Sequence, residues 1–246
     1  MKQYILLLFI MIPLLSYGKT DMEKLLERVD HAIEMDSYYQ QQKEKELKRL
    51  RRQAGDAITA EERLCYLDSL YRAYSNYRYD SSCAYVSKGL QLAEATHNTF
   101  YITCFKIHRA SVLSVGGFYG KAEDILETLD PKQMPYEQKL YYYFTYAWLF
   151  NYWQSYAAKS EFANDFKAKK KYYMNILLEN FNEKGKKSAF YQYMKGEYIF
   201  LSSPTHRSVL DCYLKALKMT AKNDRLHPMA AYGIARYYRD LEQYDL

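Results

Sequence analysis

Residues that could carry chemistry are few in this chain, and their spacing matches no common catalytic or metal-binding motif. The chain has five histidines, His31, His97, His108, His206 and His227. No two of them lie four residues apart and no HExxH occurs, which argues against the helix-borne zinc site of metalloproteases. The 9 glycines form no GxGxxG, GxxxxGK[ST] or GxSxG pattern. The sequence therefore predicts a protein that is not an enzyme, with no catalytic residue, no metal ligand and no cofactor.

The cysteines allow two interpretations. The chain has four of them, Cys65, Cys83, Cys104 and Cys212, and no CxxC pair. One interpretation is that they are small buried thiols at contacts between helices. The other is that an exported chain forms one disulfide, for which Cys65 and Cys83 are the candidates.

Tyrosine is unusually frequent, with 29 residues, and it dominates the block LYYYFTYAWLFNYWQSY at residues 140–156. The block is shorter than the roughly 20 apolar residues of a membrane span, so we expect a buried helix. Tyrosine offers a large contact area with a polar tip, which suits both core packing and a wet groove. Tyr142, Tyr146, Trp153 and Tyr156 are candidate groove residues for a peptide or a stacked sugar ring, with core packing as the alternative.

The N-terminus has the pattern of a secretory signal peptide. Lys2 precedes an apolar run from Tyr4 to Leu15, and Ser16 and Gly18 are small residues at the −3 and −1 positions of a cleavage site. We expect cleavage after Gly18 and export to the periplasm. The run is too short to span a bilayer, and no cysteine follows that would indicate a lipoprotein.

The formal net charge of +6 is mild and is spread along the predicted helices. It forms no basic block, so no nucleic-acid partner is expected for this segment.

Apolar residues at helical spacing divide the rest of the chain into a long helix and a series of helical hairpins. The sequence predicts a signal peptide at 1–18, an N-terminal helix within 19–56 and a repeat array at 57–246. The N-terminal helix is expected to run unbroken over residues 22–54, with apolar positions at Leu25, Leu26, Val29, Ile33, Leu47 and Leu50. Three starts of helices are indicated by capping residues: Thr59 with Glu62, Asp80, and Ser203 before Pro204.

The hairpins resemble degenerate tetratricopeptide repeats over residues 60–246. The best match is Gly117-x-Tyr119-x-x-Ala122, with Ala110 twelve residues earlier; Ser82 and Ala216 occupy similar small positions. Such residues are small where two helix backbones approach closely. The resemblance implies an all-α, right-handed α-α superhelix of about four and a half hairpins. Ser82 and Ala122 are farther apart than the standard 34-residue repeat allows, the register of the third repeat is not fixed, and the last repeat is expected to be truncated.

The first half also resembles the periplasmic part of membrane-anchored transcriptional regulators of Bacteroidetes, an uncharacterised family. The resemblance lies in YYQQQKEKELKRLRR at 38–52 and LYRAYSNYRYDSSCAYVSKGLQLA at 70–93. It implies a module that senses a peptide, a glycan or a protein partner through the repeat groove. In that family a membrane span and a cytoplasmic domain follow, so membrane association is expected only through a later part. The alternative is a stand-alone periplasmic scaffold without a signalling role.

Overall fold

Helices form all the regular structure in the part of the chain that the structure describes. The structure is a computed structural model and describes residues 21–221 and 224–242. The predicted signal peptide lies outside these residues. The α-helices are α1 (Asp21–Glu34), α2 (Asp36–Asp56), α3 (Ala60–Tyr74), α4 (Tyr79–Ala95), α5 (Thr99–Val115), α6 (Tyr119–Glu127), α7 (Tyr136–Tyr156), α8 (Ala163–Glu179), α9 (Ala189–Phe200), α10 (Arg207–Lys218) and α11 (Leu226–Asp240). Two short 3-10 helices, η1 (Pro131–Gln133) and η2 (Gly185–Lys187), precede α7 and α9.

The chain divides into two compact units, residues 1–56 and 57–246. The first unit contains α1 and α2, so the prediction of one unbroken helix over 22–54 was wrong. The helices join at Met35, whose amide still donates to the carbonyl of His31 at 3.0 Å. Asp36 and Ser37 follow this joint, and both residue types favour helix starts over helix interiors because their side chains compete for backbone hydrogen bonds. The Asp36 carboxylate accepts a hydrogen bond from Gln40 instead, at 2.6 Å.

The apolar positions of the first unit do not share one environment. Leu47 and Leu50 of α2 are buried. The apolar side chains at helical spacing in α1 are instead 49–67% exposed; they are Leu25, Leu26, Val29 and Ile33.

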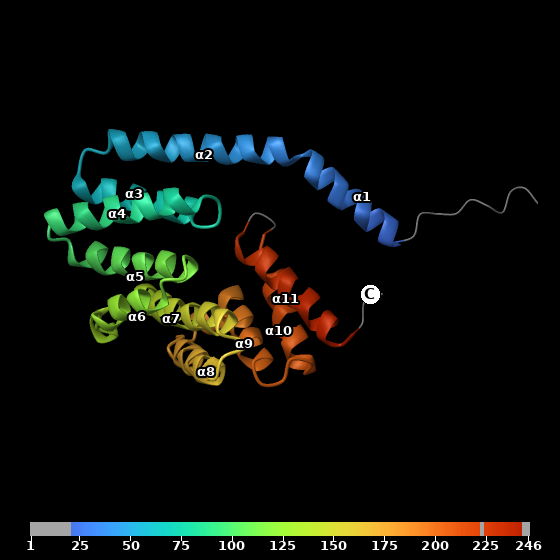
Figure 1. The fold of residues 1–246 in the computed structure, drawn as a ribbon. Helices are drawn as coiled ribbons and strands as arrows, with labels where there is room; N and C mark the ends of the chain where they lie inside the picture. Colours follow the sequence, from blue (N-terminus) through green and yellow to red (C-terminus); the bar gives the residue numbers. More distant parts are fainter. Residues whose placement is uncertain (1–20, 222–223, 243–246) are drawn as a thin grey trace, which may run out of the picture. The chain divides into compact units, whose positions relative to one another are not determined.

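The second unit is a succession of antiparallel helix pairs, α3 with α4, α5 with α6, α7 with α8, and α9 with α10, followed by α11 (Figure 1). Each pair also contacts the next, through α4 and α5, α5 and α7, α8 and α9, and α10 and α11. This arrangement is an all-α superhelical repeat, as the sequence predicted. Within the described stretches of the chain, every helix is too short or too polar to cross a lipid bilayer.

Side-chain caps set some of the predicted helix starts. Thr59 and Glu62 form the predicted capping box at α3: the Glu62 amide donates to Thr59 Oγ1 at 3.1 Å, and the Thr59 amide donates to Glu62 Oε2 at 3.2 Å. Two predicted caps were wrong. Asp80 lies in the first turn of α4, which begins at Tyr79.

Helix α10 begins at Arg207 rather than after Ser203. Its N-cap is His206, whose Nδ1 accepts from the Ser208 amide at 3.2 Å. Pro204 therefore lies before the helix and does not occupy its first turn.

Gly117 makes the turn between α5 and α6, where its φ of +83° falls in the left-handed region that glycine occupies without steric cost. The Phe118 amide donates to the Leu113 carbonyl at 2.8 Å, and the Gly117 amide donates to the Ser114 carbonyl at 3.3 Å. These two bonds close a Schellman motif. The neighbouring Tyr119 is half-buried and stacks on Trp153 with ring centroids 5.5 Å apart.

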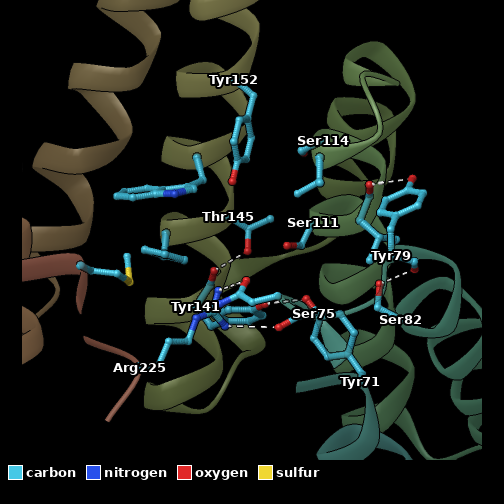
Figure 2. A pocket seen from close by; sticks show the side chains of 16 residues that line it. Tyr71, Ser75, Tyr79, Ser82, Ser111, Ser114, Tyr141, Thr145, Tyr152 and Arg225 are labelled. Atoms are coloured by element: carbon cyan, nitrogen blue, oxygen red, sulfur yellow. Dashed lines mark hydrogen bonds between the residues drawn. The ribbon is translucent and has the colours of Figure 1, made fainter. Parts of the chain in front are cut away.

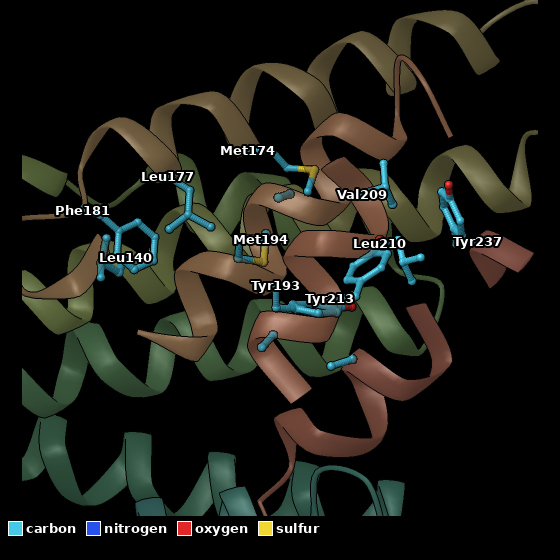
Figure 3. Packing of buried hydrophobic residues seen from close by; sticks show 13 residues of the cluster. Leu140, Met174, Leu177, Phe181, Tyr193, Met194, Val209, Leu210, Tyr213 and Tyr237 are labelled. Atoms are coloured by element: carbon cyan, nitrogen blue, oxygen red, sulfur yellow. The ribbon is translucent and has the colours of Figure 1, made fainter. Parts of the chain in front are cut away.

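The remaining predicted packing residues lie in the interior. Ser82, Ala110, Ala122 and Ala216 are all fully or almost fully buried. The largest core cluster joins α7, α8, α9, α10 and α11 around Met174, Met194 and Tyr213 (Figure 3). Tyr213 lies between two glycines: a Cβ added to Gly196 would lie 2.8 Å from its ring, and one added to Gly233 would lie 2.9 Å from it.

Candidate functional site

A small polar and aromatic cavity lies among the first helices of three consecutive hairpins. Its volume is about 80 Å³, and its walls come from α3, α5 and α7, with α4 and the start of α11 at the sides. Figure 2 shows hydroxyl groups from several helices facing this space. The side chains that matter below are Tyr71, Ser111, Tyr141, Trp148, Tyr152 and Arg225.

Helical periodicity brings one face of α7 to this cavity. Tyr141, Thr145, Trp148 and Tyr152 line it, and they are spaced by four, three and four residues. Side chains at such spacing lie above one another on one face of a helix. The cavity is therefore a property of the repeat geometry, which sets this face of α7 opposite Ser111 on α5.

Arg225 spans the cavity from the N-cap position of α11 to the turn after α3. Its Nη1 donates to Ser75 Oγ at 3.4 Å and its Nη2 donates to Asn76 Oδ1 at 3.2 Å. These contacts join residues about 150 positions apart in the sequence. They link the first and the last helical elements of the second unit across the site.

The rest of the cavity is uncharged. The hydroxyls of Tyr71 and Tyr141 are hydrogen-bonded at 3.1 Å. Burial, reinforced by Tyr71, raises the pKa of Tyr141 well above its ordinary value, so this phenol stays protonated at neutral pH. The site thus offers neutral hydroxyls, aromatic faces and one guanidinium, which suits binding through hydrogen bonds and stacking rather than through ionic attraction alone.

The four predicted groove residues lie away from this cavity. Tyr142 and Tyr146 are buried in the core, and the Tyr142 hydroxyl donates to the Leu126 carbonyl at 3.3 Å. For these two residues the structure has the packing role that the sequence analysis kept as the alternative. Trp153 stacks on Phe166 at 4.4 Å, while Tyr156 is 82% exposed at the end of α7.

A second group of functional side chains joins α3 to α5. His108 Nε2 lies 2.5 Å from Asp68 Oδ1 and 3.3 Å from Cys104 Sγ. Cys104 Sγ lies 3.7 Å from the same Asp68 oxygen. Arg72 holds the other oxygen, with its Nε 2.8 Å from Asp68 Oδ2. This cluster was not predicted, because the spacing of the histidines from one another says nothing of Asp68 and Cys104.

Burial and charge fix the ionisation of these groups. Burial raises the pKa of Asp68, but the hydrogen bond and charge of His108 and the charge of Arg72 outweigh it and lower the pKa to about 2. Burial raises the pKa of Cys104 to about 12, with the Asp68 charge adding to it. Burial lowers the pKa of His108 despite the opposing hydrogen bond to Asp68. At neutral pH the cluster is a carboxylate, a thiol and a neutral imidazole.

This geometry does not make a nucleophilic triad. In such a triad the two ring nitrogens have different partners, one the nucleophile and the other the carboxylate. Here the thiol and the carboxylate both contact Nε2, and Nδ1 is buried without a hydrogen-bond partner. The three donor atoms converge on one another and do not form a relay.

The structure distinguishes between the two interpretations of the cysteines. All four cysteines are free, so the alternative of a disulfide between Cys65 and Cys83 was wrong. Cys104 and Cys212 are buried, as the first interpretation expected, whereas Cys65 is exposed.

Comparison with known proteins agrees with the helical repeat. A search of curated proteins finds no match to the chain. The sequence model of one family, described as SusR N-terminal TPR domain, matches residues 33–246. Tetratricopeptide arrays stack helix pairs into an extended binding surface and typically act as non-catalytic scaffolds for protein interactions. The match includes the nine described α-helices of the second unit, the whole of α2 and the last two residues of α1. The chain therefore belongs to the SusR N-terminal TPR domain family.

Proposed function

We propose that this domain is the periplasmic sensing module of an envelope-spanning regulator, and that it recognises a peptide, glycan or protein partner through the cavity crossed by Arg225. Membership of the SusR family supports a regulator-associated repeat. The predicted signal peptide supports export. The geometry of the cavity carries the assignment of the binding site.

The decisive observation is that helices of three hairpins and Arg225 from a further element line one small cavity. Its volume of about 80 Å³ holds only a few water molecules. A ligand of ordinary size needs roughly 300 Å³ or more. Binding must therefore widen the space between α3, α5 and α7 or release Arg225.

Widening of the space between α3, α5 and α7 changes the curvature of the helix array, so ligand binding is coupled to this curvature. A ligand that binds only the wider, open form of the cavity shifts the population of molecules from the closed form to the open form. The change in curvature then extends to the other helices of the array. Movement of α11 away from the turn after α3 must break the hydrogen bonds of Arg225 to Ser75 and Asn76, so these bonds favour the closed form.

The test is binding of a panel of neutral oligosaccharides and short peptides, measured by calorimetry on the chain and on Trp148→Ala. Trp148 is half-buried and lines the cavity. Loss of an aromatic stacking face should weaken binding by about tenfold or more, corresponding to about 1.4 kcal/mol. Arg225→Ala should instead strengthen binding of a ligand that needs the open form, because the closed form loses the hydrogen bonds of Arg225 to Ser75 and Asn76.

Tyr156→Ala is the matched control on the same helix, since Tyr156 is exposed and does not line the cavity. It should leave binding unchanged. Loss of binding in Tyr156→Ala with full binding in Trp148→Ala would place recognition on the surface around Tyr119, Trp153 and Tyr156. Partner binding without any change in the array's conformation would favour a scaffold over a sensor.

A further inference from the structure

The cluster of Asp68, Cys104 and His108 has the donor set of a transition-metal site. We propose that these three side chains bind a zinc-type divalent cation between α3 and α5. A thiolate, an imidazole and a carboxylate together are ligands that Zn²⁺ accepts in proteins. Cys104 and His108 are four residues apart on α5, so they present their donors on the same face of one helix.

The spacing of the donors fits a tetrahedral ion with one adjustment. Zn–S and Zn–N bonds of about 2.3 and 2.0 Å place sulfur and nitrogen about 3.5 Å apart at the tetrahedral angle. Cys104 Sγ lies 3.3 Å from His108 Nε2 and 3.7 Å from Asp68 Oδ1. The contact of 2.5 Å between His108 Nε2 and Asp68 Oδ1 must open to about 3.4 Å. Arg72, which holds the other carboxylate oxygen, has a side chain that is 57% exposed and can follow this movement.

The contacts of His108 bring the three possible ligand atoms together at one ring nitrogen. The His108 side chain is fully buried, and its Nε2 faces both the Asp68 carboxylate and the Cys104 sulfur. An ion bound to Nε2 would take the place of these two contacts.

Charge balance permits a cation in this buried place. When Cys104 binds the ion, the S–H bond breaks, the S–metal bond forms, and the proton leaves to solvent. The imidazole stays neutral, with its proton moving from Nε2 to Nδ1. The thiolate and the Asp68 carboxylate then carry two negative charges, which match the charge of the ion, and a neutral cluster avoids the cost of an isolated buried charge.

An adjoining cavity gives access. It has a volume of about 280 Å³, and Cys104, Arg72, Gln138 and Tyr141 line it. Three protein ligands leave the fourth position of a tetrahedral ion open for water, and this cavity lies on the side of the thiol. The ion would therefore be exchangeable and not sealed in the core.

A bound ion would also act on the proposed binding site. The ring of Tyr71 stacks on His108 with centroids 4.0 Å apart, and Tyr71 lines the cavity that Arg225 crosses. The ion would fix α3 relative to α5, the helices on two sides of that cavity. Binding of the metal itself does not depend on the proposed function.

The test is titration of the chelator-treated chain with Co²⁺ and Zn²⁺. Co²⁺ bound to Cys104 should give a thiolate-to-cobalt charge-transfer band in the near ultraviolet, and Zn²⁺ should displace it. Zn²⁺ should raise the thermal unfolding midpoint, because it binds the folded chain. Cys104→Ser and His108→Gln should each weaken Zn²⁺ binding by about 100-fold or more, since they remove a ligand, and even outer-shell changes cost about 10–100-fold.

Cys212→Ser is the matched control, because Cys212 is another buried free thiol. It should keep both the band and the affinity. A second measurement needs no variant: Zn²⁺ should slow alkylation of Cys104 and leave the rate at Cys83 unchanged. Absence of the charge-transfer band, equal affinity in Cys104→Ser, or unprotected Cys104 would each overturn the proposal.

Discussion

Two clusters in the second unit pair a carboxylate with an arginine, yet they are built differently. In the first, Asp68 on α3 meets Arg72, Cys104 and His108. In the second, Glu197 on α9 accepts from the Tyr213 hydroxyl at 2.7 Å and from Arg236 Nη2 at 2.5 Å, and Arg236 also donates to that hydroxyl at 2.8 Å.

The difference lies in burial and in the type of donor. In the second cluster both charged partners are largely buried, with side-chain exposures of 18% for Arg236 and 6% for Glu197. Their charges cancel, and three helices pack around them. The first cluster has an exposed arginine, a thiol and an imidazole beside a cavity. A buried ion pair can therefore fix helix packing, whereas a carboxylate beside a thiol and an imidazole has the ligands to bind a cation when the thiol loses its proton.

The largest expected effect is in the second cluster. Glu197→Ala should lower the free energy of unfolding by about 3–5 kcal/mol, because it leaves a buried arginine without its counter-charge. Urea unfolding followed by circular dichroism measures this.

The matched control is Glu183→Ala. Glu183 pairs with Lys186 at 2.7 Å, but its side chain is 86% exposed. Loss of an exposed pair should cost no more than about 1 kcal/mol. An equal loss of unfolding free energy in Glu197→Ala and Glu183→Ala would mean that the buried ion pair stabilises the fold no more than the exposed pair does.

Tyr213→Phe tests the second cluster through pH. It removes a hydrogen bond to a carboxylate and should cost about 1.5–3 kcal/mol near neutral pH. Burial, followed by the Glu197 charge, raises the pKa of Tyr213 above its ordinary value of 10.0. The neutral phenol is therefore favoured in the folded state, and its stabilisation is present below pH 10 and lost as pH rises further.

The unfolding free energy of the unchanged chain should accordingly fall above pH 10, and that of Tyr213→Phe should fall less steeply. Denaturant unfolding at a series of alkaline pH values measures both slopes. Tyr156→Phe, at an exposed tyrosine, should match the unchanged chain. Parallel slopes for all three proteins would contradict burial of the Tyr213 hydroxyl.

Gly233→Ala tests how closely α11 approaches this cluster. The added Cβ would lie 2.9 Å from the Tyr213 ring. Overpacking of this kind should cost about 1–3 kcal/mol. Gly120→Ala is the matched control, because an added Cβ there meets no atom within 4 Å. In that helix position alanine should be neutral or stabilising by up to about 1 kcal/mol. The thermal unfolding midpoint should therefore fall in Gly233→Ala and should stay the same or rise in Gly120→Ala.

The helical hairpins could be predicted because their evidence is local. Periodic apolar positions, the Thr59 capping box and the glycine turn at Gly117 each act within a few residues. The break at Met35 was missed because neither glycine nor proline lies near it. Only the helix-starting character of Asp36 and Ser37 marks the joint.

The two sites could not be predicted because their evidence is tertiary. Aromatic residues occur all around α7, so their spacing does not say which face of the helix packs on a neighbouring helix. Tyr142 was therefore predicted to line the groove, whereas the structure has Tyr141 in the cavity. The spacing of Cys104 and His108 is visible in the sequence. Asp68 joins them only because α3 and α5 come together in the fold.

The smallest expected effect on stability is that of Arg72→Gln, which is compared with Arg236→Gln in the second cluster. Arg72→Gln removes the partner of Asp68 Oδ2, but Arg72 is exposed and His108 remains bound to Oδ1, so the unfolding free energy should change by no more than about 1 kcal/mol. Arg236→Gln, measured in the same urea titration, should cost several times more because it leaves Glu197 buried without its cation. Arg72→Gln should also raise the affinity for Co²⁺, since a positive charge beside the carboxylate is gone. A large loss of stability in Arg72→Gln would mean that Asp68 serves mainly as the counter-ion of this arginine. The first cluster would then be, like the second, an ion pair that stabilises helix packing.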